Sequence, residues 1–299
     1  MAINLHLLRL FAAVAAARSF SRAAEALHVS QPAVSKGVRE LEGQLGLRLL
    51  ERGPGGVALT EAGTVLAARA ATLFAAERDA EDDLAALRGI RRGRLSVGAS
   101  TTIATYMLAR PIAAFAAAHP GIDLHLTSAN SRAVAEALIA RTIDVALVEG
   151  PAVHPAVTAT PWREDRMAVI APPSHPLVLS GAPVPAGRLA DETFILREVG
   201  SGTGDVARAA LAALGLQDGR RLEIGSTEAI KQVVAAGFGL AIVSAAAAAD
   251  QIALGRLAVL PVEGFDVVRT LSLLALPDRP PGPAARAFLA TLARDAPAG

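Results

Sequence analysis

The stretch SFSRAAEALHVSQPAVS, residues 19–35, has the pattern of two short helices joined by a tight turn. Ser21 is a suitable N-cap for a helix over Arg22–Leu27. Ser30 can cap a second helix that has Pro32 in its first turn, where a missing N–H costs nothing. Small alanines in the first helix leave room for the two helices to cross closely. The pattern predicts a helix-turn-helix.

The segment before this stretch is apolar and ends in small residues, as a signal peptide would. However, no Lys or Arg precedes it, and Arg9 lies inside it. Leu7, Leu10, Phe11 and Val14 instead stand at i, i+3, i+4 and i+7, which is the spacing of an amphipathic helix. The other long apolar run, 233–249, contains two glycines and stops short of the ~18–20 apolar residues of a membrane span. The sequence predicts a cytoplasmic protein without a membrane segment.

Turn-forming residues follow the predicted helix-turn-helix. Gly53-Pro54-Gly55-Gly56 precedes a short alternating segment, which predicts a small β-wing. Thr60 and Glu61 then open a long helix, with a capping hydroxyl and a carboxylate at the positive end of the helix dipole. Apolar residues recur along it in steps of four and three, except at Glu77; they are Leu66, Ala70, Leu73, Ala80, Leu84 and Leu87. A seam this narrow favours pairing with one partner helix, whereas packing on its own chain would need a wider stripe.

Beyond a predicted hinge at Arg88–Arg94, apolar runs alternate with helical patterns. The expected strands are Leu95–Ala99, Ile122–Leu126, Val145–Val148, Met167–Ala171, Phe194–Leu196, Leu222–Ile224, Leu240–Val243, Leu257–Pro261 and Leu271–Leu276. Helices are expected near 103–118, 131–140, 206–214 and 283–293. Repeated strand–helix–strand units predict an α/β fold with a parallel sheet covered on both faces. Two α/β lobes are favoured over one sheet of eight or more strands.

These patterns predict three parts: residues 1–60, a winged helix-turn-helix; 61–94, a linker helix and hinge; and 95–299, the α/β part. Within the last, lobe I is expected at about 95–165 and 270–299, and lobe II at about 166–269. The formal net charge of +1 hides an uneven distribution, because residues 1–60 carry seven Lys or Arg against four Asp or Glu. No carboxylate lies between Glu25 and Glu40, so a polyanion could approach there.

The sequence contains little that indicates a catalytic or metal-binding site. The chain has no cysteine, no G-x-S-x-G elbow, and no H-x-x-x-H pair among its six histidines. The sequence therefore predicts neither catalytic residues nor metal ligands, and no cofactor. Gly200-Ser201-Gly202-Thr203-Gly204 follows a predicted strand, but it matches neither G-x-x-x-x-G-K-[ST] nor G-x-G-x-x-G.

Hydroxyl and amide side chains follow several predicted strands at the start of the next helix. Each one alone is most simply an ordinary N-cap. Together, with Arg197 and Lys231 nearby, they would form a small-anion site, because such strand ends face one crevice in an open α/β sheet. The candidate residues are Ser100, Thr101, Thr102, Asn130, Ser131, Arg197, Ser201, Thr203 and Thr227.

Residues 19–35, together with Leu41-Glu42, Leu45-Gly46, Leu49 and Leu59-Thr60-Glu61-Ala62-Gly63, resemble the DNA-binding domain of LysR-type transcriptional regulators. The remaining chain is similar in length and order to the effector-binding domain of that family. Residues 196–203 and 225–230 resemble a subgroup that includes regulators of carbon fixation and sulfur metabolism. The resemblance implies a dimerising linker helix, two periplasmic-binding-protein-like lobes with a ligand cleft between them, and a homodimer or homotetramer.

The resemblance also implies partners and contact residues. The partners are double-stranded DNA with an interrupted inverted repeat, a small-molecule effector and, for an activator, RNA polymerase. The strand-end hydroxyls described above predict that the effector is an anion. The implied DNA-contact residues are Ser21, Arg22, Gln31, Pro32, Ser35, Lys36 and Arg52. Gln suits an adenine edge, and Lys suits phosphate or guanine. The chain departs from the family at Gly55 and Gly56, where the wing usually has basic residues, and at Gly204, where Arg often stands.

Two other classes remain open from the residues alone. A transport-type binding protein would share the α/β lobes, but it would need an export signal and would leave the first ninety residues unexplained. A nucleotide-dependent enzyme would need a phosphate loop or an acid/base pair, and the sequence offers neither.

Overall fold

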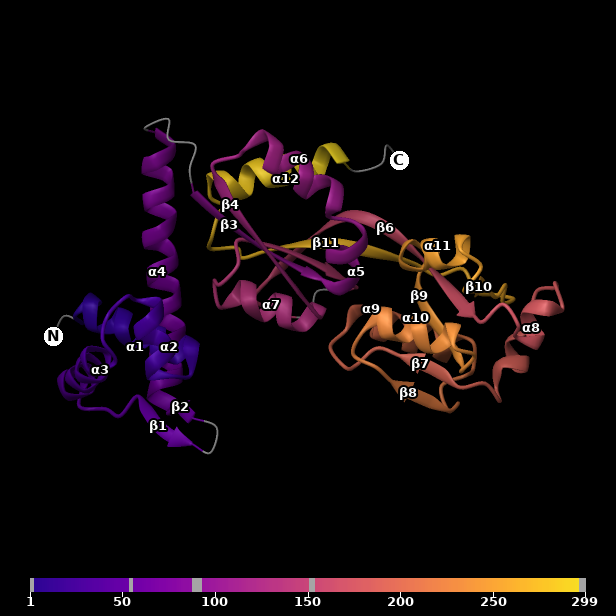
Figure 1. Cartoon of the computed structure of the whole chain (residues 1–299), viewed down its shortest axis with the longest axis horizontal. Helices are drawn as coiled ribbons and strands as arrows, with labels where there is room; N and C mark the ends of the chain where they lie inside the picture. Colours follow the sequence, from indigo (N-terminus) through magenta and orange to yellow (C-terminus); the bar gives the residue numbers. More distant parts are fainter. Residues whose placement is uncertain (1–2, 54–55, 88–92, 151–153, 296–299) are drawn as a thin grey trace. The chain divides into compact units, whose positions relative to one another are not determined.

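The computed structural model describes residues 3–53, 56–87, 93–150 and 154–295, and the chain divides into two compact units, residues 1–81 and 82–299 (Figure 1). The N-terminal unit contains α1 (Leu5–Ala17), α2 (Phe20–Ala26), α3 (Gln31–Leu45), β1 (Leu50–Gly53), β2 (Gly56–Leu59) and most of α4 (Glu61–Leu87). The strands β1 and β2 pair antiparallel as a wing. This arrangement confirms the winged helix-turn-helix.

The cap of α2 differs from the prediction. Ser19, and not Ser21, is the N-cap, and its Oγ accepts a hydrogen bond from the N–H of Arg22 at 3.4 Å. The helix consequently begins two residues earlier, at Phe20. Ser30 caps α3 as expected, accepting from the N–H of Ala33 at 3.4 Å.

The motif residues after α3 hold the wing to the helices. Glu42 Oε1 accepts hydrogen bonds from the N–H groups of Leu49 at 2.8 Å and Leu50 at 3.2 Å. The Thr60 hydroxyl donates to the carbonyl of Arg48 at 2.7 Å and accepts from the N–H of Gly63 at 3.0 Å. A Cβ on Gly63 would lie 1.9 Å from the carbonyl oxygen of Leu49. Only glycine therefore lets the start of α4 approach the chain this closely.

The predicted seam of α4 divides into two parts. Ala70 is fully buried and Leu66 half-buried in the core of the N-terminal unit, so these two pack against their own chain, which corrects the prediction. Leu73 and Leu84 are 39% and 57% exposed. Glu77 interrupts the apolar pattern because it accepts a hydrogen bond from Arg9 of α1 at 2.7 Å. The side chain of Leu87 and most of the predicted hinge lie outside the described residues.

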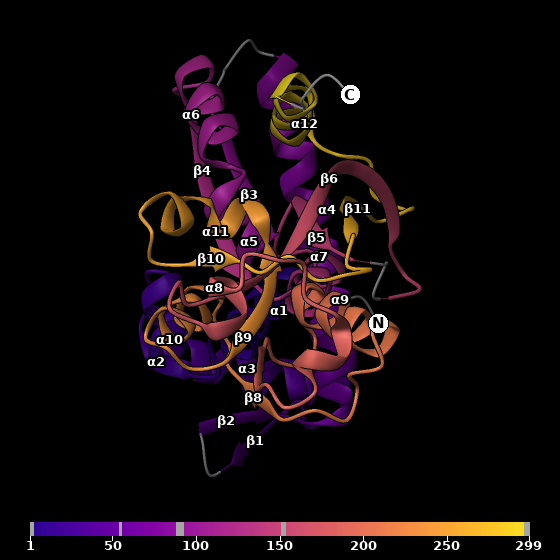
Figure 2. The same ribbon diagram turned by 90° about the vertical axis from the view of Figure 1, so that its right-hand side faces the viewer.

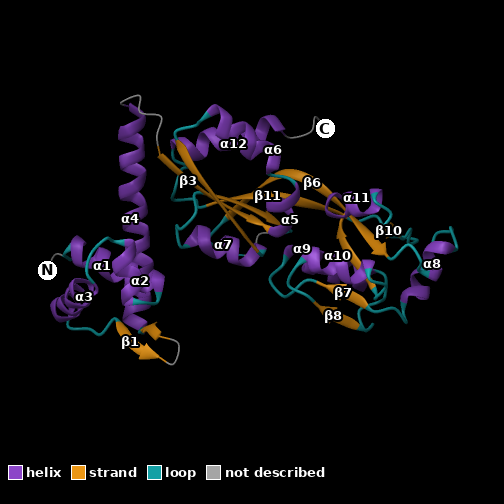
Figure 3. Ribbon diagram, viewed as in Figure 1, coloured by secondary structure: helices purple, strands orange, loops and turns teal. Residues whose placement is uncertain are grey.

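In lobe I, β3 (Gly93–Ser100) lies between β4 (Ile122–Ala129) and β5 (Val145–Glu149), parallel to both. The helices α5 (Thr101–Tyr106), α6 (Ala109–Ala118) and α12 (Pro283–Asp295) cover one face, and α7 (Ser131–Ile139) covers the other (Figure 3). The segment predicted as one helix near 103–118 is thus two helices, with Met107 and Leu108 buried between them.

In lobe II, β9 (Leu240–Ser244) and β8 (Arg221–Glu223) flank β7 (Phe194–Leu196) in parallel. Figure 2 labels β8 and β9 in a view turned by 90° from that of Figure 1. Short α8 (Pro176–Leu179) and the 3-10 helix η1 (Ala186–Leu189) precede these strands. Two cores enclose the sheet, one under α9 (Gly202–Ala213) and the other under α10 (Thr227–Ala235) and α11 (Ala245–Ala253). Among the described residues, no helix has both the length and the apolarity that crossing a bilayer requires.

Two long strands join the lobes. Strand β6 (Thr158–Ala171) pairs with β11 (Val268–Ala275) at its start and with β9 and β10 (Ala258–Val259) at its end. Strand β11 also pairs with β5. All of these pairings are antiparallel, so the prediction of a parallel sheet is wrong for β6 and β11. The reason is that β11 returns from lobe II to lobe I alongside β6, in the opposite direction.

Candidate effector site and DNA-binding surface

The start of α3 forms the exposed surface that the sequence predicts. Gln31, Pro32 and Lys36 are exposed, and Ser35 is half-buried. Ser21 and Arg22, at the start of α2, are also exposed. The backbone of Arg52 pairs with Val57 in the wing, and its side chain lies outside the described residues, as does Gly55.

A groove of about 920 Å³ runs between α3 and the wing, and Gln31 and Ser35 line it together with Arg39 and Arg48. Both arginines are exposed. Arg39 Nη2 donates a hydrogen bond to the Ser35 hydroxyl at 3.1 Å. Sequence reasoning missed these two cations, although the i, i+4 spacing of Ser35 and Arg39 puts them on one face of the helix.

In the regulatory unit, predicted hydroxyls converge on a carboxylate of the chain itself. Glu149, the last residue of β5, accepts hydrogen bonds from Ser100 Oγ at 2.8 Å and from Thr203 Oγ1. Thr203 belongs to lobe II and also lies 3.4 Å from Thr102 of lobe I, oxygen to oxygen. The strand-end hydroxyls therefore come together, as predicted, but they already bind the carboxylate of Glu149, Ser100 through Oε1 and Thr203 through Oε2.

The two crossing strands supply the charges that balance Glu149. Arg269 of β11 donates through Nη1 to Glu149 Oε2 at 2.9 Å and through Nε to Asp165 Oδ2 at 2.8 Å. Asp165 is the register partner of Arg269 on β6 and accepts from Ser244 of lobe II at 2.7 Å. We name these side chains the Glu149 cluster: Ser100, Glu149, Asp165, Thr203, Ser244 and Arg269. All are at most 5% exposed, and two carboxylates share one guanidinium.

Burial by itself raises the pKa of Glu149, because a carboxylate is less well solvated inside the protein. The charge of Arg269 and the hydrogen bonds from hydroxyls outweigh burial, and the pKa is held below its ordinary value of 4.5. Because the pKa of Glu149 is lower in the folded protein than in the unfolded chain, its ionised carboxylate stabilises the folded protein above pH 4.5. That contribution is lost as the pH falls through the lower folded value.

The glycine-rich loop lets the lobes approach at this cluster. Gly202 is the first residue of α9, and a Cβ there would lie 2.2 Å from the carbonyl oxygen of Glu149. Any larger residue would push the start of α9 away from the end of β5. The motif that resembles a phosphate loop is thus a close contact between two lobes.

A second cluster contains Arg197, the arginine that the sequence predicts for the effector site. Arg197 donates to Glu198 through Nε at 2.7 Å and through Nη2 at 2.9 Å, and its Nη1 donates to Thr227 Oγ1 at 3.0 Å. Asn130 of lobe I donates to Glu198 Oε1 at 3.3 Å. We name these four residues the Arg197 cluster. Burial is the largest single influence on the pKa of Glu198 and raises it. The hydrogen bonds and charge of Arg197, a backbone hydrogen bond and the hydrogen bond from Asn130 together outweigh burial, so the pKa is lowered.

Other predicted residues serve mainly local roles. Asn130 and Ser201 cap their helices, accepting from the N–H groups of Ala133 and Gly204. The hydroxyl of Thr101 donates to the carbonyl of Ala129, and that of Ser131 to the carbonyl of Glu149. Lys231 of lobe II donates to Tyr106 of lobe I at 2.9 Å. The described residues bring no metal-binding group of three or more His, Asp or Glu together.

Sequence reasoning missed the carboxylates and one arginine of this region. Glu149 directly follows a predicted strand, and Glu198 directly follows Arg197, but sequence position does not show which way either side chain points. Asp165 and Arg269 are 104 residues apart, and only the pairing of β6 with β11 brings them together. In place of the arginine expected at Gly204, Arg208 lies one turn later and donates to the carbonyl of Arg197 at 3.1 Å.

The chain combines a winged helix-turn-helix, whose α3 has an exposed start, with two α/β lobes that meet over buried polar groups. This combination is typical of a DNA-binding regulator with a ligand-binding domain. Residues 5–64 match the description "Bacterial regulatory helix-turn-helix protein, lysR family", and residues 88–297 match "LysR substrate binding domain". The chain therefore belongs to the LysR family, whose members are transcriptional regulators and not enzymes.

Individual proteins agree with this assignment. The chain is 37% identical to a RuBisCO operon transcriptional regulator of Allochromatium vinosum over 288 residues, covering 96% of this chain and 95% of the relative. Full-length CbnR, solved with its target DNA, has a TM-score of 0.67 and 26% identity over 98% of this chain and all of CbnR. The CcmR regulatory domain of Synechocystis PCC6803, solved with 2-PG, has a TM-score of 0.63 and 29% identity, over 68% and 97% of the two chains.

Proposed function

We propose that this LysR-type regulator binds an interrupted inverted repeat in a promoter, as a homodimer or homotetramer, and that a small anion bound between its two lobes controls it. Functionally, residues 1–60 read DNA, 61–94 dimerise and transmit, and 95–299 bind the effector. As an activator it would contact RNA polymerase. Regulators in this family bind DNA and small effectors, and the relative CbnR was solved on its target DNA.

The observation that carries the anionic effector is the buried Arg197 between the lobes. Its side chain is 3% exposed, and its guanidinium already holds a carboxylate with two hydrogen bonds. Asn130 from lobe I and Thr227 from lobe II reach the same pair of residues. An arginine in such surroundings selects negative groups, because a planar fork of N–H donors matches carboxylate and phosphate geometry. The complex of CcmR with 2-PG agrees in ligand class.

The predicted site residues divide accordingly. Asn130, Arg197 and Thr227 are our candidates for direct contact with the anion. Ser100, Thr102 and Thr203 would act indirectly, since their hydroxyls surround Glu149. Thr101, Ser131 and Ser201 would support the strand ends and helix starts around the site.

A thermal-shift screen of the full chain tests the ligand class, with carboxylates, phosphate esters and sulfate against neutral compounds of equal size. An anion at ~100 times its dissociation constant should add about 2.7 kcal/mol to the stability of the fold that binds it. Thr227→Val removes a hydroxyl with little change in volume, so the shift from the best anion should become smaller.

The matched control is Thr291→Val, because Thr291 is also buried but bonds within α12, to the carbonyl of Ala287. Its anion shift should equal that of the parent. Stabilisation by neutral apolar compounds alone would contradict the proposal. A gel shift with the chain's own upstream DNA, with and without the best anion, checks the regulatory half.

A further inference from the structure

Two buried arginines of the regulatory unit each hold an internal carboxylate, Arg269 with Glu149 and Arg197 with Glu198. We propose that the effector anion enters by exchange, displacing the carboxylate of Glu198 from Arg197, while Glu149 stays in place as a fixed link between the lobes. Glu198 is then an internal competitor that sets the affinity of the site. The inference rests on the proposed function, because it presupposes an anionic effector.

The bonds to be exchanged have the geometry that an anionic ligand needs. The Arg197 side chain is fixed on its far side by Nη1, which donates to Thr227 at 3.0 Å. Its Nε and Nη2 point together at the two oxygens of Glu198, at 2.7 and 2.9 Å. Two parallel N–H groups bind a ligand carboxylate or phosphate in the same bidentate way. A ligand could therefore take over both bonds without movement of Arg197.

Exposure decides which of the two glutamates can leave. The side chain of Glu198 is already 25% exposed, so a rotation of its own side chain can take the carboxylate into water. The side chain of Glu149 is 2% exposed, and it would remain buried without a partner if Arg269 were taken from it. A buried charge that has lost its partner is strongly unfavourable. The exchange therefore falls on Glu198.

Charge leads to the same choice. In the Glu149 cluster, Arg269 is shared by Glu149 and Asp165, so an incoming anion would meet two carboxylates around one cation. In the Arg197 cluster, the departure of Glu198 leaves one buried guanidinium for one anion. An ion pair without a like charge beside it is the more favourable of the two arrangements.

The exchange would also alter a contact between the lobes. Asn130 of lobe I donates to Glu198 of lobe II, and the N–H of Arg132 donates to the carbonyl of Gly200 at 3.2 Å. When Glu198 leaves, the amide of Asn130 becomes available to the ligand, which then touches both lobes. A ligand that bridges the lobes in this way favours the arrangement in which it makes both sets of bonds.

The test is calorimetric titration of the full-length protein with two probes, 2-PG and inorganic phosphate. Glu198→Gln keeps the shape of the side chain but removes the charge that competes for Arg197, so the dissociation constants should fall about tenfold. Arg197→Lys keeps the cation but loses the fork, so they should rise about tenfold or more. Glu149→Gln should not tighten binding of either probe.

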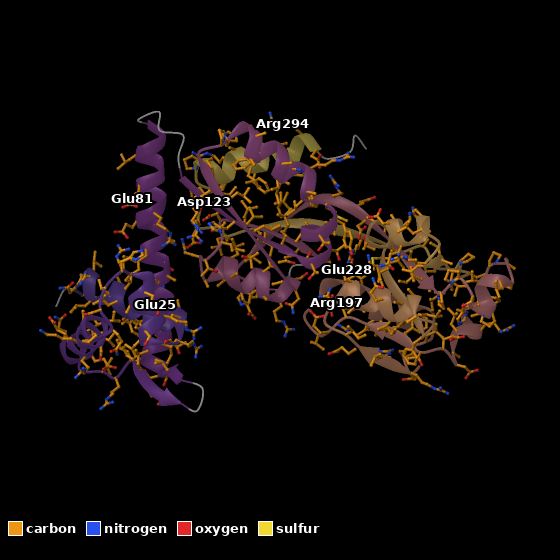
Figure 4. All side chains as sticks on the ribbon, viewed as in Figure 1. Glu25, Glu81, Asp123, Arg197, Glu228 and Arg294 are labelled. Atoms are coloured by element: carbon orange, nitrogen blue, oxygen red, sulfur yellow. The ribbon has the colours of Figure 1, made fainter. Side chains whose placement is uncertain are left out.

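Glu228→Gln is the matched control. Glu228 also belongs to lobe II, where Figure 4 labels it together with Arg197. It is half exposed and pairs with Lys231, so its substitution removes the same charge from the same region. Since an exposed charge is screened by solvent and salt, it should change the dissociation constants less than about twofold. Melting curves without probe establish that each variant is folded. If Arg197→Lys does not fold, the comparison of Glu198→Gln with Glu228→Gln is sufficient to test the exchange.

The outcomes separate the two proposals. If neither the parent nor any variant binds either probe, the anionic effector is wrong and the exchange falls with it. If the parent binds and Glu198→Gln binds equally, the exchange is overturned while the proposed function stands. Equal tightening by Glu228→Gln would show a long-range charge effect, which also overturns it. If only Glu149→Gln tightened binding, Glu149 and not Glu198 would be the carboxylate that the anion displaces, and the proposed exchange would be wrong. Binding by Glu198→Gln alone would support a competitor strong enough to mask the site.

Discussion

On α3 of the N-terminal unit, Gln31 and Lys36 are exposed to solvent, whereas Arg197 and Thr203 in the regulatory unit are 3% and 1% exposed and bonded to glutamates of the same chain. The first surface can meet an outside partner as it stands. The second is already occupied from within. A polar side chain at a helix start therefore means different things in the two units, and the difference is whether the fold places an internal partner opposite it.

The largest expected effect concerns α4. Its apolar seam contains both residues that are exposed and residues that already pack within their own unit. Leu73→Asp with Leu84→Asp puts charges where we expect two helices to pair, since these leucines are exposed while Leu66 and Ala70 pack within their own unit. The dimer should separate. Operator affinity should fall roughly 10⁴-fold, about 5.5 kcal/mol, because each subunit then holds only one half-site. Light scattering and gel shifts measure the two effects.

Ala68→Asp is the control for this pair, because Ala68 is exposed two residues from Leu66 and Ala70, on the other side of the helix. It should leave the oligomer and operator binding unchanged. An intact dimer in the double leucine variant would refute the assigned interface.

The next effect contrasts a buried with an exposed arginine on the crossing strands. Arg269→Met leaves Glu149 and Asp165 without their shared cation inside the protein, so unfolding in urea should show a loss of about 3–5 kcal/mol. Arg166→Met removes an exposed pair with Asp266, and the loss should be below about 1 kcal/mol. Equal losses would mean that the Glu149 cluster does not stabilise the joined lobes.

The smallest effects concern the exposed surface of α3. Gln31→Ala should cost about 1–3 kcal/mol at the preferred operator and relax base preference, because a base-edge contact is lost. Lys36→Ala should weaken binding to all sequences alike and lower the slope of log affinity against log salt by about one, because a phosphate contact is lost. A binding-site selection profile unchanged by Gln31→Ala would show that this residue does not read a base.

Much of the fold could be predicted because local signals agree with tertiary packing. Ser30, Pro32 and Thr60 mark helix starts by chemistry that acts within four residues, and α3 and α4 begin where these residues predict. Strands β3, β5 and β7 are short buried runs between helices and lie where expected. The prediction was wrong where direction matters. The part of β6 that pairs with β11, Thr158–Arg166, is mostly polar and lies before the predicted strand Met167–Ala171, so no local signal indicated this antiparallel pairing.

The candidate site was predicted less completely. Ser100 and Thr203 were identified from their places at helix starts, but their common partner, Glu149, was not. Glu198 was likewise missed although it adjoins Arg197, because neighbours in sequence need not face each other. Arg39 differs, since its position four residues after Ser35 already put it on the same face of α3 as Ser35.

The sequence by itself determined where α3 and α4 begin, the exposed face at the start of α3, the alternation of strands and helices, and the family. Each of these depends on residues a few positions apart, whose relative placement is set by helix and strand geometry. Only the tertiary structure decided that Glu149 fills the space between Ser100 and Thr203, and that Arg269 lies against Asp165. These contacts join residues about 50 to 120 positions apart, so they exist only once both lobes are folded and the crossing strands are paired.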